Sequence, residues 1–187
     1  MRLNDPSYHK TVLDSGIRVI SERIPYVRSV SIGAWIIVGS RDENADINGI
    51  SHFIEHMMFK GTSSRSAAQI AQSLESVGGH LNAFTSKEQT CYYAHILDEH
   101  LDIAVDVIAD ILCDSVFDPI EMSKERNVIL EELRAIEETP EELIFDLFWR
   151  DVFDDPLGLS IIGSEKTLNQ MSRDNVLDYL SQNFAVL

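Results

Sequence analysis

The sequence predicts a single α+β domain, and three observations carry this prediction. Runs that are β-branched or that alternate apolar and polar side chains dominate the N-terminal half of the chain. From about residue 98 the pattern changes to the apolar period of amphipathic helices. No repeat, linker or low-complexity stretch divides the 187 residues, which are enough to bury the core of one domain.

Antiparallel strands are predicted near residues 9–13, 17–23 and 28–38, with Gly16 in the first turn. A helix is predicted around 67–77, and it leads to Gly78 and Gly79. Two further strands follow, at 80–85 and 89–97. The remaining elements are helices, predicted at 99–114, 119–138, 141–152 and 172–183.

A short helix is predicted between the third strand and residue 67. Its apolar positions are Ile50, Phe53, Ile54, Met57 and Met58. Asn48 is suited to cap its start, and Gly61 to follow its end after the cationic Lys60. Phe53, Ile54 and Met57 are therefore expected in the core, with the opposite side of the helix facing a cleft.

That opposite side carries the sequence H-x-x-E-H at residues 52–56, the inverted zinc-hydrolase motif. Residues three and four apart share a helix face, so His52, Glu55 and His56 would lie side by side. Two imidazoles can then bind one metal ion while the carboxylate reaches a water molecule. The alternative is a surface helix that happens to be rich in His and Glu.

A tetrahedral zinc site with two histidines lacks one protein ligand. His80, His95 and His100 are candidates, and so is any carboxylate on a neighbouring helix; His9 lies in the first strand and is a poor one. Spacing alone does not choose among them.

The net charge of −16 argues against nucleic acid as a partner, because such proteins present a basic surface. It fits a basic peptide, although solubility alone also explains it. No apolar run is long enough to cross a membrane, and residues 1–6 resemble no signal or transit peptide. Cys91 and Cys113 are too few for a disulfide framework and are expected to be buried thiols in a reducing cytoplasm.

Residues 52–62, H-F-I-E-H-M-M-F-K-G-T, resemble the pitrilysin/insulinase family of zinc peptidases. The resemblance is closest to the branch that contains the catalytic subunit of mitochondrial processing peptidase and its bacterial relatives. It extends over nearly the whole chain, through residues 13–19, 33–41, 78–86, 156–158 and 162–163. Leu159 departs from the family pattern, which usually has a basic residue there.

The resemblance implies a processing-peptidase-like metallohydrolase half: a mostly antiparallel sheet covered on one side by helices. The family's third ligand, a glutamate in a V-I-L-x-E segment, corresponds to Glu132, 76 residues after His56. One zinc ion per chain would be held by His52, His56 and Glu132. Glu125 corresponds to an important acidic residue of relatives, with a water-positioning or ligand-supporting role; a solvated helix residue is the alternative.

The implied activity is that of a zinc metalloendopeptidase acting on peptides or presequences. Zinc lowers the pKa of its bound water to about 7, and Glu55 acts as general base. The peptide would lie as an added edge strand along Leu81, Asn82, Ala83 and Phe84. A non-catalytic scaffold or peptide-binding subunit of the same family is the alternative, although such subunits typically lose motif residues.

Family members are built from two similar halves, and residues 1–187 resemble the N-terminal half. Full activity would then need a second half-domain or a homologous subunit, and homodimerisation is another way to cover the exposed face. The expected location is the cytoplasm of a bacterium, or the mitochondrial matrix if the chain is eukaryotic.

Overall fold

A three-stranded antiparallel sheet forms the centre of the computed structural model, which describes residues 8–184. The strands are β3 (Ser29–Ile36), β4 (His80–Thr85) and β5 (Thr90–Leu97), in the order β3-β5-β4. In the register, Trp35 and Phe84 both pair with Cys91. The predicted strands at 28–38, 80–85 and 89–97 are thus confirmed, and β4 lies at one edge of this sheet.

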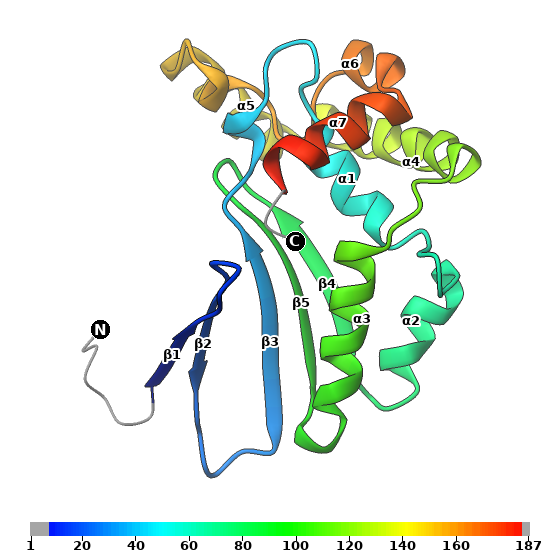
Figure 1. Ribbon diagram of the computed structural model, residues 1–187. Coiled ribbons are helices and arrows are strands. Elements are labelled where there is room, and N and C mark those ends of the chain that lie inside the picture. The colour runs from blue at the N-terminus through cyan, green and yellow to red at the C-terminus, as the bar shows by residue number, and fades with distance from the viewer. Residues whose placement is uncertain (1–7, 185–187) are drawn as a thin grey trace.

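Helices cover one face of the three-stranded sheet. On that face Tyr92, Ala94 and Ile96 of β5 are buried, because strand side chains alternate between the two faces. Helices α2 (Ala67–Glu75) and α3 (Leu101–Cys113) run along this side of the sheet (Figure 1). The predicted α+β fold, with an antiparallel sheet and helices on one side, is confirmed.

The opposite face of the sheet carries exposed aromatic side chains. Trp35 and Phe84 project from it and meet edge to face, with ring centroids 5.6 Å apart. Tyr93 follows Phe84 on the same face, at 6.2 Å.

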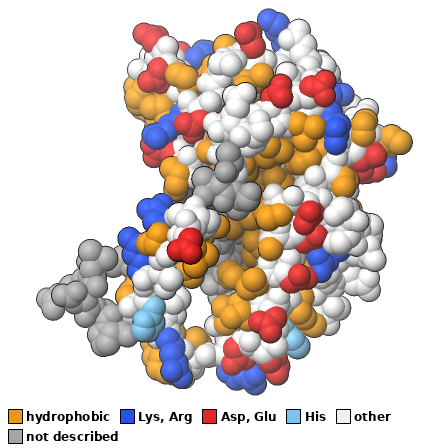
Figure 2. All heavy atoms as spheres, viewed as in Figure 1, with side chains coloured by type: hydrophobic (Ala, Val, Ile, Leu, Met, Phe, Trp, Pro, Cys, Tyr) orange, Lys and Arg blue, Asp and Glu red, His pale blue; other side chains and the backbone are white. Residues whose placement is uncertain are grey.

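The N-terminal hairpin stands apart from this sheet. Strands β1 (Tyr8–Val12) and β2 (Arg18–Glu22) pair only with each other within the described residues, and Gly16 with φ of +90° forms the turn as predicted. Neither face of the hairpin packs on the core, so Val19 and Ile20 stay exposed. Figure 2 shows hydrophobic side chains at the surface beside this hairpin.

The other helices gather at one end of the sheet (Figure 1). They are α1 (Ile50–Met58), α4 (Pro119–Glu138), α5 (Pro140–Val152), α6 (Glu165–Gln170) and α7 (Arg173–Asn183). All the predicted helices are present, and most bounds agree within two residues. The sequence pattern missed α6, since six residues are too few to show an apolar period.

Local capping explains where α4 begins. Pro119 occupies its first position, and the Asp118 carboxylate accepts hydrogen bonds from the backbone N–H groups of Ile120 and Glu121. Helix α5 likewise begins with Pro140, one residue earlier than predicted.

The two cysteines differ in environment. Cys91 is buried, as predicted, whereas Cys113 is exposed because it ends α3 on the side away from the core. Both are free thiols. Within residues 8–184, no helix combines the length and the apolar character needed to span a membrane.

Candidate metal site and active-site cleft

Helix α1 separates a buried face from a face that opens into a cleft. Ile50, Phe53 and Ile54 are fully buried, and Met57 is 1% exposed. His52, Glu55 and His56 are only partly buried, on the other side of the helix. The prediction that Phe53, Ile54 and Met57 pack in the core is confirmed, and its cause is the periodicity of the apolar residues. On the other side, His52 and Glu55 line the cleft described below, whereas His56 is not among its lining residues.

The ends of α1 differ from the prediction. Gly49, with φ of +94°, is the N-cap residue, and Asn48 lies before it. The Asn48 side chain instead donates to Glu43 and to the carbonyl of Ser160, so it makes tertiary contacts rather than capping the helix. At the other end Phe59 is the C-cap, which places Gly61 one position further from the helix than predicted.

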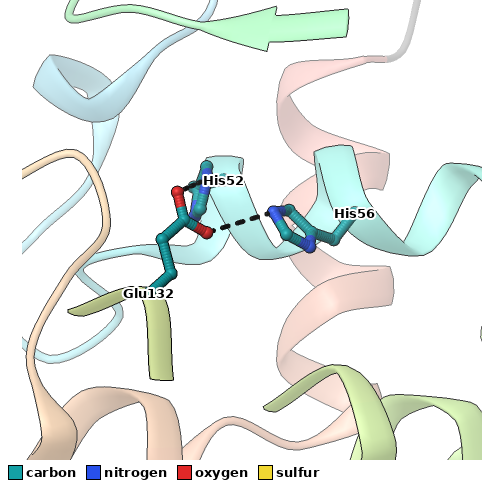
Figure 3. Close-up of side chains that lie close together, drawn as sticks. All are labelled: His52, His56 and Glu132. Carbon is teal, nitrogen blue, oxygen red and sulfur yellow. Dashed lines mark ion pairs between the residues drawn. The ribbon is translucent and has the colours of Figure 1, made fainter. Parts of the chain in front are cut away.

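Glu132 of α4 meets the two histidines of α1 (Figure 3). Its Oε1 lies 3.7 Å from Nε2 of His52, and its Oε2 lies 3.6 Å from Nε2 of His56. One ligand atom from each of the three residues falls within 4.8 Å of the others. This is the only such group of three or more His, Cys, Asp or Glu found in residues 8–184, so the other candidate histidines lie elsewhere.

The three residues fit a zinc ion by their chemistry. Two imidazoles and one carboxylate form a ligand set of catalytic zinc sites, which leave a coordination position open. Burial, and then the neighbouring His56, lowers the pKa of His52 to about 4, so this imidazole is neutral and able to bind a metal at neutral pH. Lys60, which follows the end of α1, forms its ion pair with Glu125.

Glu125 lies behind His56, on the side away from Glu132. Its Oε2 is 3.2 Å from Nδ1 of His56, and its Oε1 is 2.7 Å from Nζ of Lys60. The side chain is only 8% exposed, and both of its oxygens are engaged. A carboxylate at Nδ1 fixes the orientation of a ring whose Nε2 binds a metal. This geometry favours the supporting role over the water-positioning role.

Glu55 lies beside the cluster and faces the same cleft. Its carboxylate accepts a hydrogen bond from the hydroxyl of Thr85 at the end of β4. Burial raises the pKa of Glu55 above its ordinary value, with the Thr85 hydrogen bond opposing the shift. Sequence reasoning missed Thr85, although its place in the segment that resembles the family's substrate strand was a possible clue.

The cleft is built from four parts of the chain. Helix α1 and helix α4 supply the metal-site residues, β4 supplies one wall, and α5 with the segment after it supplies the other. The residues that line it are His52, Glu55, Ala83, Phe84, Thr85, Glu132, Ile136, Glu142, Phe145, Asp146, Ser160, Ile161 and Ile162.

Of the four residues predicted to bind substrate, two line the cleft. Ala83 and Phe84 do so, whereas Leu81 packs against the core and Asn82 is exposed. The side-chain oxygen of Asn82 accepts a hydrogen bond from the backbone N–H of Ala83, at 2.9 Å. That N–H therefore points away from β5, toward the open edge of the sheet.

Sequence reasoning also missed Glu43. Its buried carboxylate accepts hydrogen bonds from the backbone N–H groups of Gly49 and Ser51, at the start of α1. It therefore caps the helix that carries the two histidines. No local pattern marks such a cap, because the residue lies well before the helix.

Residues 18–165 match the model of the family described as Insulinase (Peptidase family M16). The chain is 49% identical over 167 residues to the uncharacterized zinc protease YmxG of Bacillus subtilis, a match that covers 89% of this chain. It is 46% identical over 165 residues to an uncharacterized zinc protease of Mycobacterium leprae, with 88% of this chain covered. The chain spans only 41% and 37% of the lengths of these relatives.

Two solved structures share the fold. A protease from Helicobacter pylori superposes with a TM-score of 0.91 at 24% identity, covering 96% of this chain and 44% of that one. The periplasmic protease PqqL of Escherichia coli gives a TM-score of 0.87 at 23% identity, covering 96% of this chain and 21% of its own. At this level of identity the likeness concerns the fold.

Proposed function

The chain belongs to the insulinase family of peptidases, family M16, and from this premise we propose that it is the metal-binding part of a zinc-dependent endopeptidase. The resemblance noted at residues 52–62 is confirmed by the family match, and the relatives named above are zinc proteases. One observation carries the proposal. His52, His56 and Glu132 converge, and His52, Glu132 and the neighbouring Glu55 line a cleft together with the edge strand β4.

His52, His56 and Glu132 would hold one zinc ion per chain. When bound, zinc would act as a Lewis acid. It would lower the pKa of a water molecule enough to make it a nucleophile near neutral pH, and it would polarise the peptide carbonyl. Glu125 would keep the ring of His56 in place through Nδ1, supported by Lys60.

Glu55 would act as the general base. Its carboxylate takes a proton from the attacking water and passes it to the amine that leaves. The Thr85 hydroxyl holds one carboxylate oxygen, so the other is left to face the water. Because Thr85 belongs to β4, the same strand that would bind the peptide also orients the base.

The peptide would bind in an extended form along β4. This strand is an edge of the three-stranded sheet, and the N–H of Ala83 points outward. The substrate carbonyl would replace the side-chain oxygen of Asn82 as the acceptor of that N–H. Backbone pairing binds many sequences, so side chains around the cleft would set the preference.

The wall opposite β4 supports a preference for basic peptides. Glu142 and Asp146 of α5 line the cleft, and no Lys or Arg is among its lining residues. An acidic wall attracts cationic side chains and disfavours acidic ones.

Replacing Glu142 by Gln is expected to raise KM for an arginine-containing peptide by about three- to tenfold, with little change in kcat, because one partly solvated charge pair is lost. Steady-state kinetics at low and high salt would measure this, and the effect should shrink as salt is added. The control is Glu141→Gln, which removes a neighbouring charge outside the cleft. Equal effects of the two variants, or none, would contradict a specific role for Glu142.

We further propose that residues 1–187 form one domain, the N-terminal half of a two-half protein. The chain covers less than half of each relative named above, which supports this division. A second half-domain, a homologous subunit or a second copy would then complete the enzyme. Cleavage of presequences and a location in the bacterial cytoplasm stay predictions.

The proposal is tested by metal-dependent cleavage. A fluorogenic peptide with internal arginines is incubated with the chain, alone and within a longer parent protein. Cleavage should stop after zinc is removed by a chelator and return when zinc, but not magnesium, is added back. Peptide binding without cleavage in the zinc-loaded parent would instead favour a non-catalytic peptide-binding subunit.

A further inference from the structure

Glu43 is a buried carboxylate with no part in the chemistry described above. It follows the short helix η1 (Ser40–Asp42) and is 2% exposed. Its Oε2 accepts hydrogen bonds from the N–H of Gly49 at 2.7 Å and from Nδ2 of Asn48 at 2.9 Å. Its Oε1 accepts one from the N–H of Ser51, also at 2.9 Å. Glu43 thus binds two backbone N–H groups at the start of α1, those of the N-cap residue Gly49 and of Ser51, from outside the helix.

An acidic residue is a costly choice for this position. Burial raises the pKa of Glu43, and the three hydrogen bonds only oppose that shift. Two other helices of this chain have neutral caps, Ser66 on α2 and Ser172 on α7. The acidic cap of α4, Asp118, is exposed to solvent, whereas Glu43 is buried. The charge of Glu43 interacts with Lys87, but a neutral cap would satisfy the N–H groups too, so the charge leaves room for a second role.

The position of His52 indicates that role. His52 is the third residue of α1, so a cation bound to it lies near the partly positive N-terminus of the helix. This partial charge opposes cation binding. A carboxylate placed at the same end offsets it, in a buried environment where screening by solvent is weak.

Asn48 extends the contact from Glu43 to the cleft wall. Its Nδ2 also donates to the carbonyl of Ser160 at 2.8 Å, and the Ser160 hydroxyl donates to Asp146 of α5 at 2.6 Å. The backbones of Gly49 and Gly163 are so close that a Cβ on Gly49 would lie 2.6 Å from the carbonyl oxygen of Ile162. The start of α1 is therefore held between Glu43 and the segment 160–163.

We propose that Glu43 is a positioning residue of the metal centre. It holds the start of α1 so that His52 faces Glu132, and its negative charge favours a cation at that site. Through Asn48 it also keeps this end of the helix in register with the cleft wall. The inference rests on the proposed function, because it takes zinc as the ion that the histidines bind.

The test is the zinc affinity of Glu43→Gln, measured by competition with a chromophoric chelator. The variant keeps the size of the side chain but loses the charge and one acceptor. The dissociation constant is expected to rise by about 10- to 100-fold, as for other residues that support metal ligands. The absorption spectrum of the cobalt(II)-loaded protein should change as well, because His52 is displaced. Near-ultraviolet circular dichroism establishes that the variant is folded.

Ser66→Ala is the matched control, since it removes a cap from α2 and should leave zinc affinity unchanged. If Glu43→Gln does not fold, Glu43→Asp, which keeps the charge but shortens the side chain, is measured instead and should also bind zinc more weakly. A folded variant that binds zinc within twofold of the wild type, with an unchanged cobalt spectrum, would overturn the inference and leave Glu43 a purely structural cap. A wild-type chain that binds no zinc would overturn the proposed function itself.

Discussion

Replacing Glu55 by Gln is expected to lower kcat for peptide hydrolysis strongly and to leave zinc content unchanged. Gln has the shape of Glu, and its side-chain oxygen can still accept the hydrogen bond from Thr85. It cannot take a proton from water at neutral pH, so the general base is lost. Catalysis of this kind contributes about 10²- to 10⁴-fold, and kcat should fall by a factor in that range.

The measurement is kcat of the zinc-loaded variant within the longer parent protein, with zinc content determined on the same sample. Glu131→Gln is the control, since Glu131 is an exposed glutamate that pairs with Arg134 and lies outside the cleft. If Glu55→Gln keeps more than about a tenth of wild-type kcat, well above the loss expected for a general base, another group removes the proton. If the variant loses its zinc, Glu55 has a role in metal binding instead.

Glu132→Ala is expected to lose the metal. Glu132 supplies the only carboxylate of the three-residue cluster, and removing it leaves two imidazoles from a single helix. Substitution of a residue that merely supports a ligand weakens metal binding by about 10- to 100-fold, so loss of a ligand should exceed about 100-fold. His56→Ala should behave in the same way.

Elemental analysis after dialysis at equal zinc concentration measures this loss. The wild type should hold close to one zinc per chain, and both variants close to none. The neighbouring substitution Glu131→Ala serves as the control and should keep the wild-type content. Zinc retained in Glu132→Ala would show that a different residue completes the site.

Most elements of the fold were predictable from local patterns. The apolar period of α4 and the alternation in β5 depend only on residues close together in the chain, so the sequence shows them directly. Helix α6 was not predicted because its six residues are too few to show the apolar period of a helix. The separation of the β1–β2 hairpin from the three-stranded sheet was not predicted either. Alternation of apolar and polar residues predicts a strand but does not determine which strand it pairs with.

The caps of α1 show how tertiary contacts override a local preference. Asn48 has the right chemistry for an N-cap, yet its amide is used by Glu43 and by the Ser160 carbonyl. Both partners come from outside the helix. Glycine at position 49 is required for a different reason, since its backbone passes close to Gly163 with φ of +94°.

The sequence by itself determined that His52, Glu55 and His56 share one face of a helix, because their spacing matches its period. The resemblance to known zinc peptidases pointed to Glu132 and Glu125. Only the tertiary structure decided that α4 approaches α1 closely enough for Glu132 to meet both histidines, and that Glu125 lies behind His56. The same holds for Thr85 beside Glu55 and for Glu43 at the helix start. The physical reason is the same for these four residues. Contacts between residues far apart in the chain depend on how whole helices and strands pack, and local periodicity does not determine that packing.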